Sequence, residues 1–441
     1  MSLKVALISL GCSKNLVDSE VMVDLMSDNG FDITGDARQA DVIIVNTCGF
    51  IESAKQESVD SIIEMGQYKE QGRCKVLIAS GCLAERYKDE LIKEMPELDA
   101  VIGTGDYKNI IDVINSALQG KKVIKYGNQE NINIDVLPRR ISTMGASAYL
   151  KIAEGCDNRC TYCIIPQLRG RYRSRSMEEI LKEARHLAAN GIKELNVIAQ
   201  DITRYGKDLY GEYKLAELLN RLSEIDGICW IRLLYSYPDE FNDLLIETMA
   251  GNDKICKYLD IPIQHASNKI LKSMARRSTR EDARELIGKL RQRMPGIALR
   301  TSLIVGFPGE TEADFEELVD FVKEIKFDRL GVFTYSREED TPAYEMAGQI
   351  DEDVKLKRQE IIMLAQQEIS HENNRQMIGK DLEVLIEGLE DGRYFGRSYK
   401  DAPEIDGAVY FESDKALQPG EFCVVRITRA DEYDLVGEVN L

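Results

Sequence analysis

The stretch Glu154-Gly155-Cys156-Asp157-Asn158-Arg159-Cys160-Thr161-Tyr162-Cys163 holds three cysteines in a Cys-x3-Cys-x2-Cys array. It directly follows the apolar run 148–153 (AYLKIA), the first of six strand-like runs that alternate with helical patterns up to residue 336. This alternation predicts a parallel sheet covered by helices, and six units favour a partial (β/α)6 barrel. Because such barrels carry their functional groups on the loops after the strands, we expect the array at the mouth of the barrel.

The regions on either side of this predicted barrel have different patterns. Residues 1–120 alternate apolar runs with helical stretches, which predicts a doubly wound α/β domain. Residues 121–146 are polar, contain Pro138 and lack helical periodicity, so we expect a linker there. The barrel domain then spans residues 147–375. Residues 376–441 contain five short strand-like runs with glycine turns, which predict a small antiparallel β-barrel.

Three further cysteines lie just beyond predicted strands of the first domain. The strand-like runs VALISL, DVIIVNT and KVLIAS are followed by Cys12, Cys48 and Cys82. The carboxyl ends of parallel strands share one edge of the sheet, so thiols spread over 70 positions can converge there. Packing as a small buried hydrophobe would explain any one of these cysteines, but it explains all three less well.

Composition limits the classes of function. The 441 residues include 57 Lys and Arg against 76 Asp and Glu, a net charge of -19, which makes nucleic acid unlikely as the primary substrate. No apolar run approaches the about 18 residues of a membrane span, and the first residues lack a signal-peptide pattern. We therefore expect a cytoplasmic protein without a membrane partner. In a reducing compartment, its ten cysteines are better explained as metal or cluster ligands than as disulfides.

The donor set of the array favours iron and sulfur. A closed zinc site needs a fourth ligand, and the nearest candidates are His186, inside a predicted helix, and Cys229. Three thiolates instead suit a 4Fe-4S cluster with one open iron. A zinc knuckle, unrelated thiols, or a non-catalytic iron-sulfur carrier or sensor remain the alternatives. The cysteines without partner spacing are expected in the core or at incidental positions; they are Cys74, Cys229, Cys256 and Cys423.

These motifs together resemble a known family. The array resembles the signature of radical S-adenosylmethionine (SAM) enzymes, with Tyr162 at the aromatic position before the third cysteine. With GCSKN, NTCGF and SGCLAER around the three earlier cysteines and a terminal β-barrel of the TRAM, OB-like type, the chain resembles the radical SAM methylthiotransferases over nearly its whole length. The resemblance implies two 4Fe-4S clusters. One, on Cys12, Cys48 and Cys82, holds the transferred sulfur as sulfide or persulfide; the other, on Cys156, Cys160 and Cys163, chelates SAM.

The resemblance also implies the reaction. One SAM methylates the held sulfur, and a second SAM, cleaved with an electron from an external one-electron reductant, yields the radical that removes a hydrogen from the substrate. No catalytic residue beyond the cluster ligands is implied. The expected cofactor-binding residues, which lie beside the array or after predicted strands, are Tyr162, Gln200, Gln264, Val305 and Gly306. For the glycine turn, a purely structural role is the alternative.

Two weaker signals are also open to two interpretations. His265 follows a predicted strand and either orients the substrate or is a structural histidine. The basic stretch with Arg169, Arg171, Arg173 and Arg175 either neutralises an acidic substrate or cofactor group or forms a solvated charged face.

Members of this family modify either an adenosine of transfer RNA or the β-carbon of an aspartate in small-subunit ribosomal protein number twelve, at the decoding centre. Residues 376–441 carry seven Lys and Arg against fifteen Asp and Glu, a net charge of -8, which favours a basic protein over RNA. The segments 10–20 (LGCSKNLVDSE) and 401–407 (DAPEIDG) resemble the ribosomal-protein branch. The resemblance thus implies aspartate methylthiolation, with transfer-RNA adenosine 2-methylthiotransferase as the alternative.

Overall fold

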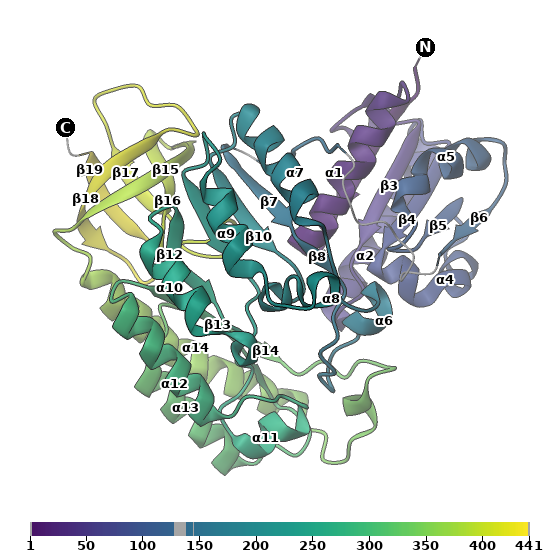
Figure 1. Ribbon diagram of the computed structural model, residues 1–441. Coiled ribbons are helices and arrows are strands. Elements are labelled where there is room, and N and C mark those ends of the chain that lie inside the picture. The colour runs from purple at the N-terminus through teal and green to yellow at the C-terminus, as the bar shows by residue number, and fades with distance from the viewer. Residues whose placement is uncertain (1, 128–137, 144, 440–441) are drawn as a thin grey trace.

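The computed structural model describes residues 2–127, 138–143 and 145–439, which form three regions in chain order (Figure 1). The first is a parallel sheet with helices on both faces, the second a larger open parallel sheet, and the third a closed barrel. This arrangement confirms the predicted fold class. Residues 128–137 of the expected linker lie outside the described residues, and a strand at Val123–Lys125 joins the first sheet.

The first region is a six-stranded sheet in the order β2-β1-β3-β4-β5-β6, with every pair parallel. Its strands are β1 Lys4–Ser9, β2 Asp32–Ile33, β3 Val42–Thr47, β4 Val76–Gly81, β5 Ala100–Ile102 and β6 Val123–Lys125. The strand order reverses between β1 and β3, the switch point at which doubly wound sheets bind ligands. The three long apolar runs of the sequence are β1, β3 and β4, and the other strands have only two or three residues.

Helices cover both faces of this sheet. On one face, α1 (Ser13–Asp28) and α5 (Ile110–Leu118) pack against apolar residues of β1, β3 and β4. On the other face, α2 (Glu52–Gly66) and α4 (Cys82–Glu94) cover the alternate side chains of the same strands. The short α3 (Tyr68–Gln71) follows α2. The helices α1 and α4 therefore start at the sheet edge where the cysteines lie.

The second region is an open sheet of six parallel strands in the order β14-β13-β12-β11-β10-β7. Its strands are β7 Ser147–Lys151, β10 Glu194–Ile198, β11 Trp230–Leu233, β12 Ile255–Asp260, β13 Ala298–Val305 and β14 Arg329–Thr334. Its helices are α6 Ile165–Arg169, α7 Met177–Ala189, α8 Lys207–Tyr210, α9 Leu215–Ser223, α10 Asp243–Gly251, α11 Asn268–Ser273, α12 Arg280–Arg293, α13 Glu312–Ile325 and α14 Glu352–Arg375. All six predicted strands are present, and the helix predicted around His186 is α7, where the Ser176 hydroxyl accepts a hydrogen bond from Glu179 N. A two-stranded sheet of β8 (Ala153–Glu154) and β9 (Arg173–Ser174) brackets the cysteine array.

The third region is a closed five-stranded barrel in the order β15-β16-β17-β19-β18. Its strands are β15 Asp381–Glu390, β16 Arg393–Ser398, β17 Val409–Glu412, β18 Phe422–Ala430 and β19 Leu435–Val439. They coincide with the five predicted runs. The pair β17 and β19 is parallel, whereas the other four pairs are antiparallel. This parallel pair closes the barrel.

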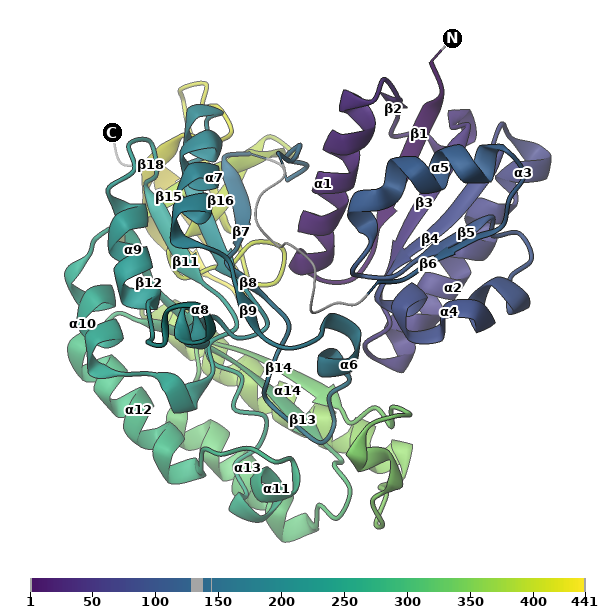
Figure 2. The same ribbon diagram turned by 45° about the vertical axis from the view of Figure 1, so that its right-hand side comes forward.

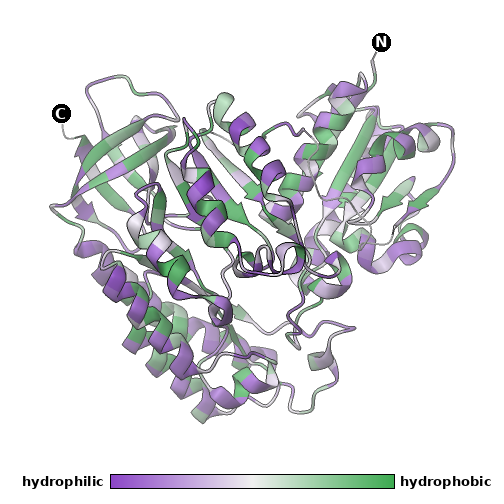
Figure 3. Cartoon of the chain, viewed as in Figure 1, coloured by the Kyte–Doolittle hydropathy of each residue, from purple (hydrophilic) through white to green (hydrophobic). Residues whose placement is uncertain are grey.

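The three regions pack together around one apolar cluster. It joins Val17 of α1, the barrel residues Trp230 and Tyr258, and Leu385 and Ala402 of the last region. The turned view in Figure 2 shows α6 between the second region and the first, where it contacts α4. Figure 3 shows largely hydrophobic strands in the parallel sheets, with hydrophilic residues on the covering helices. Among the described residues, no helix has the length and hydropathy needed to cross a bilayer.

Candidate functional site

The first three cysteines lie at one edge of the first sheet, as predicted from their positions after strands. Cys12 is the N-cap of α1 after β1, Cys48 follows β3, and Cys82 is the first residue of α4 after β4. These three strands are neighbours in the sheet, so the fold brings the three thiols together. We call Cys12, Cys48 and Cys82 the sheet-edge cysteines.

Glycines let the loops of these cysteines approach one another. Gly81 has a φ of +92°, and a Cβ there would lie 2.6 Å from the carbonyl oxygen of Thr47 and collide with the Asn46 side chain. A Cβ on Gly11, whose φ is +84°, would lie 2.8 Å from Cβ of Cys48. Only glycine fits these two positions, because both the left-handed backbone and the lack of space exclude a side chain.

Asn15 ties two of these loops together. Its side-chain amide donates hydrogen bonds to the carbonyl oxygens of Leu10 and Thr47, both at 2.9 Å, just before Cys12 and Cys48. The Asn46 side chain returns a hydrogen bond of 2.9 Å to the carbonyl oxygen of Asn15. These buried hydrogen bonds fix the start of α1 against the end of β3.

The second set, Cys156, Cys160 and Cys163, lies on the loop between β8 and α6; we call it the loop cysteines. Its surroundings include two groups that sequence reasoning missed. Cys160 Sγ lies 3.1 Å from the hydroxyl of Tyr237, and the Arg276 guanidinium lies 3.8 Å from the centre of the Tyr237 ring. A cation and a phenol are therefore placed beside this thiol.

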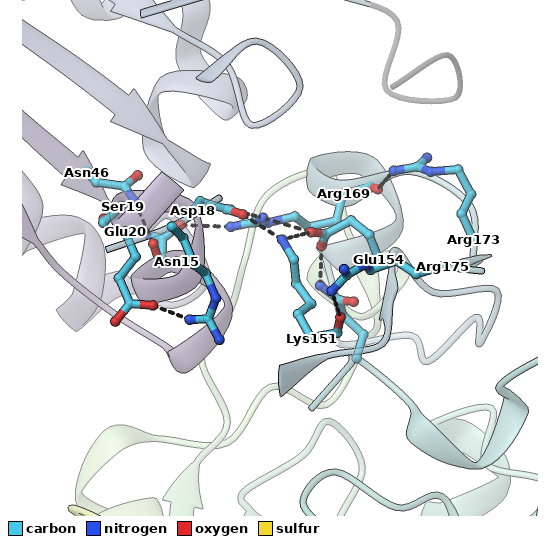
Figure 4. Close-up of polar contacts among 12 residues, drawn as sticks. Asn15, Asp18, Ser19, Glu20, Asn46, Lys151, Glu154, Arg169, Arg173 and Arg175 are labelled. Carbon is cyan, nitrogen blue, oxygen red and sulfur yellow. Dashed lines mark hydrogen bonds and ion pairs between the residues drawn. The ribbon is translucent and has the colours of Figure 1, made fainter. Parts of the chain in front are cut away.

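Buried ion pairs join α1 of the first region to the second region, as Figure 4 shows. Lys151 of β7 reaches Asp18 of α1 at 2.5 Å and Glu154 at 2.7 Å. Arg169, the last residue of α6, reaches the other Asp18 oxygen at 2.6 Å and Asn15 Oδ1 at 2.7 Å. Two cations thus face two carboxylates, the balance that buried ion pairs require. Through Asn15 and Glu154, this network is continuous with both cysteine loops.

A second buried network lies beside the first. Arg139 pairs with Glu20 of α1 and, at 2.7 Å, with Glu183 of α7. Glu183 also pairs with Arg175 at 2.6 Å. The basic stretch predicted after the cysteine array is therefore not a solvated face throughout, because Arg169 and Arg175 are 3% and 4% exposed and are bound to internal carboxylates. Arg171 is exposed.

Burial sets the protonation of the thiols. It raises the pKa of Cys82 to about 12, although the nearby Arg169 guanidinium opposes the shift, and it raises the pKa of Cys156 to about 12. Burial also raises the pKa of Cys48 and of Cys163 above the ordinary thiol range. Because metals bind the thiolate, ligation at these sites must release protons.

Lys14 lies between the first of the sheet-edge cysteines and the mouth of the barrel. It lies in the first turn of α1, two residues after Cys12, and is 5% exposed. Its Nζ is 2.7 Å from the centre of the Tyr235 ring, just past the end of β11. Burial lowers the pKa of Lys14 to about 7, against the attraction of Cys12 and Asp260. Neither Lys14 nor Tyr235 was singled out by the sequence.

The predicted cofactor-binding residues lie at the ends of the barrel strands. Gln200 follows β10, and its side-chain amide donates a hydrogen bond of 2.6 Å to Glu154. The side-chain oxygen Oε1 of Gln200 is buried without a hydrogen-bond partner among the described residues, so it suits an N–H group of a ligand. Gln264 follows β12 and pairs with Leu303 of β13 in a parallel bridge. Tyr162 packs in a small apolar cluster with Phe307 and Tyr335, among others.

The glycine turn after β13 has a structural explanation of its own. Val305 is buried at the end of the strand, and Gly306 has a φ of +73° with no room for a Cβ against Lys355. The backbone N–H of Gly306 donates a hydrogen bond of 2.7 Å to Glu310. His265 is 1% exposed, and its ring nitrogen Nδ1 accepts a hydrogen bond of 2.9 Å from Ser267 N. This hydrogen bond stabilises the loop after β12.

The four remaining cysteines have no site of their own among the described residues. Cys74 and Cys256 are buried in apolar clusters, Cys423 packs at the edge of the cluster inside the small barrel, and Cys229 is exposed. The expectation of core or incidental positions is confirmed.

The donor sets fit iron-sulfur clusters better than single ions. In the described part of the chain, no three His, Cys, Asp or Glu side chains approach tightly enough to hold one metal ion. A closed structural zinc site needs four protein ligands, and each cysteine set supplies three. Three soft thiolates per site match a four-iron cluster that keeps one iron free of protein ligands.

In comparisons with known proteins, three family models match successive parts of the chain. Residues 4–103 match Uncharacterized protein family UPF0004, residues 150–322 match the Radical SAM superfamily, and residues 378–439 match the TRAM domain. In fold, the chain is similar to the radical S-adenosylmethionine methyltransferase TsrM from Kitasatospora setae, with a TM-score of 0.56 at 16% identity over 78% of this chain and 74% of that chain.

Full-length relatives are much more similar in sequence. Ribosomal protein uS12 methylthiotransferase RimO from Thermoanaerobacter sp. (strain X514) is 55% identical over 98% of this chain and 99% of its own. The protein of the same name from Caldanaerobacter subterraneus subsp. tengcongensis is 58% identical over the same shares of the two chains. With 434 residues aligned at this identity, the chain belongs to the RimO family of radical SAM methylthiotransferases, whose chemistry implies 4Fe-4S clusters and SAM.

Proposed function

We propose that this protein transfers a methylthio group to the β-carbon of an aspartate in ribosomal protein uS12. The observation that carries the proposal is the identity of 53–58% over 98–100% of the chain with relatives named for that reaction. The reaction would take place in the cytoplasm, where ribosomal proteins are made.

The two cysteine sets divide the work in this proposal. The sheet-edge cysteines Cys12, Cys48 and Cys82 hold one cluster and the sulfur to be transferred, as sulfide or persulfide. The loop cysteines Cys156, Cys160 and Cys163 hold the other cluster. When bound, that cluster supplies the electron, received from an external reductant, that cleaves SAM. Radical chemistry is required because no ordinary side-chain base ionises an unactivated C–H bond at neutral pH.

The residues around the loop cysteines have supporting roles. Cofactor contacts at the barrel mouth come from Tyr162, Gln200, Gln264, Val305 and Gly306. Gln200 is the best supported of these, because its side-chain oxygen Oε1 is buried without a hydrogen-bond partner among the described residues. Tyr237 and Arg276 place a hydroxyl and a positive charge beside Cys160.

The charge of the last region favours a protein substrate. Residues 376–441 have a net charge of -8, and phosphate binding would require a positive surface. A basic ribosomal protein is attracted by the same surface. Transfer RNA is thus disfavoured as the substrate.

The test is a deletion strain analysed by mass spectrometry for both candidate products. We expect uS12 to lose the mass of a methylthio group, while the 2-methylthioadenosines of transfer RNA remain. The reverse pattern would assign the protein to transfer RNA. Purified, reduced protein that fails to cleave SAM would instead point to an iron-sulfur carrier or sensor.

A further inference from the structure

Lys14 is a buried lysine without an ion-pair partner among the described residues. It is 5% exposed, and within the described part of the chain its Nζ has no hydrogen bond or ion pair, only the face of Tyr235 at 2.7 Å. A buried ammonium group is stable only beside an anion, so this side chain is placed to bind one.

The carboxylates near Lys14 are bound to other groups. Asp260 accepts a hydrogen bond from Tyr235 N at 3.2 Å and pairs with Arg300 at 3.3 Å. Glu154 is held by Lys151 at 2.7 Å and by Gln200 at 2.6 Å. The neighbouring cations are therefore neutralised within the protein, whereas Lys14 is not.

Arg276, which also has no ion pair among the described residues, differs from Lys14 in two respects. It donates a hydrogen bond of 2.7 Å to the carbonyl oxygen of Pro262, and it lies beside Cys160 of the loop cysteines. Lys14 instead follows Cys12 by two residues and faces the end of a barrel strand. It thus reaches from the sheet-edge cysteines to the mouth of the barrel.

Lys14 does not stabilise its own helix, and the residue beneath it has an unusual backbone. The first turn of α1 contains no acidic residue, and a lysine at the positive end of a helix is unfavourable for helix stability. Tyr235, on which Lys14 rests, has a φ of +65°, a left-handed conformation that a bulky residue adopts only at a cost. The helix end and the ammonium group together create a positive potential that attracts an anion.

We propose that Lys14, resting on the Tyr235 ring, binds the side-chain carboxylate of the substrate aspartate and makes the enzyme select aspartate over asparagine. The inference rests on the proposed function. The β-carbon of aspartate is bonded directly to its carboxylate carbon, so holding the carboxylate between the two cysteine sets brings the β-carbon within reach of both. Lys14 forms no covalent bond and transfers no proton in this role. An adenosine, which lacks a carboxylate, would gain nothing from this cation.

The experiment measures binding of uS12 to the reconstituted, full-length protein. The probes are uS12 and its variant with asparagine at the modified aspartate. The wild type is expected to bind the aspartate form about tenfold or more tightly, the size of one charge-assisted hydrogen bond. In Lys14→Met this preference disappears, while affinity for the asparagine form and the iron content stay unchanged. Lys121→Met, at an exposed lysine of the first region, keeps the preference.

Several results would overturn the inference. These are that Lys14→Met retains the aspartate preference, that it binds both forms of uS12 equally more weakly, or that it loses iron. Iron loss would mean that the lysine stabilises the cluster site instead. Failure of the proposed function has a different signature, because the wild type would then leave uS12 unmodified. A wild type that methylthiolates uS12 but binds both forms equally would refute only the role of Lys14.

Discussion

The two cysteine sets differ in how the chain builds them. The loop cysteines come from eight consecutive residues on one loop, whereas the sheet-edge cysteines come from three strand ends spread over 70 positions. The first arrangement depends on local geometry, and the second depends on the order of strands β1, β3 and β4. We therefore expect that a substitution in one cysteine set leaves the structure of the other set intact, as long as the buried ion pairs between them remain formed.

The largest effect is expected from removing one ligand of each set. Cys156→Ala should abolish formation of 5'-deoxyadenosine, because the proposed function assigns to the loop cysteines the cluster that cleaves SAM. Cys12→Ala should retain SAM cleavage and lose methylthio transfer. Both products are measured by chromatography of anaerobic reactions, and the opposite pattern would reverse the two roles.

Glycine substitutions separate the two sites without touching a thiol. A Cβ at Gly81 would collide with Asn46 and Thr47, and a Cβ at Gly155, where φ is +82°, would collide with the carbonyl oxygen of Arg171. We expect each alanine variant to bind about half the iron of the wild type, about four instead of about eight atoms. Gly81→Ala should still form deoxyadenosine, and Gly155→Ala should not.

The control for these variants is Gly30→Ala. Gly30 has a φ of +82° but no heavy atom within 4 Å of its Cβ position, so only the backbone cost of about 1 kcal/mol applies. It should bind the full amount of iron. Equal iron loss in all three variants would mean that the loss reflects general instability rather than the cysteine loops.

The ion pairs between the sites are expected to have the next largest effect. Arg169→Met leaves Asp18 underneutralised in a buried place, which costs about 3–5 kcal/mol of unfolding free energy. Arg284→Met breaks an exposed pair with Glu324 and should change the unfolding free energy far less, because water screens that pair. Urea unfolding of the protein without clusters measures both. Similar costs for the two variants would refute a structural role for the buried network.

The smallest expected effect is a loss of folding stability at acidic pH. Burial disfavours the charge of Glu154, but Lys151 and Arg169 outweigh it, so its pKa lies below the ordinary value of 4.5, at about 2. A depressed carboxyl pKa contributes stability above the unfolded-state pKa, and that stability is lost as the pH falls from about 4.5 towards 2. The urea midpoint should fall more steeply over this range in the wild type than in Glu154→Gln. Parallel curves would exclude Glu154 as a source of the acid sensitivity.

Much of the fold follows from local patterns. The six barrel strands and the five strands of the small barrel are apolar or alternating runs bounded by turns, and the structure has all of them. The strands β2, β5 and β6 have two or three residues, too few to show a pattern, and they depend on pairing with their neighbours. The parallel pairing of β17 with β19 follows from closing the barrel, which no single run encodes.

The candidate site was predictable to a similar degree. Spacing identified Cys156, Cys160 and Cys163, and position after strands identified the sheet-edge cysteines. The network between them was not predictable, because Lys151 and Asp18 are 133 residues apart and Arg169 and Asp18 are 151 apart. Only the packing of α1 against the barrel brings these residues together. The sequence of the basic stretch around Arg169 therefore does not indicate that its side chains are buried.

The central claim is that the chain builds two separate three-cysteine cluster sites. It is tested most directly by counting iron and sulfide after anaerobic reconstitution of the wild type and of the variant in which Cys12, Cys48 and Cys82 are all alanine. The account predicts about eight irons and eight sulfides per wild-type chain, and about four of each in the variant. About four irons in the wild type, or an unchanged count in the variant, would contradict it.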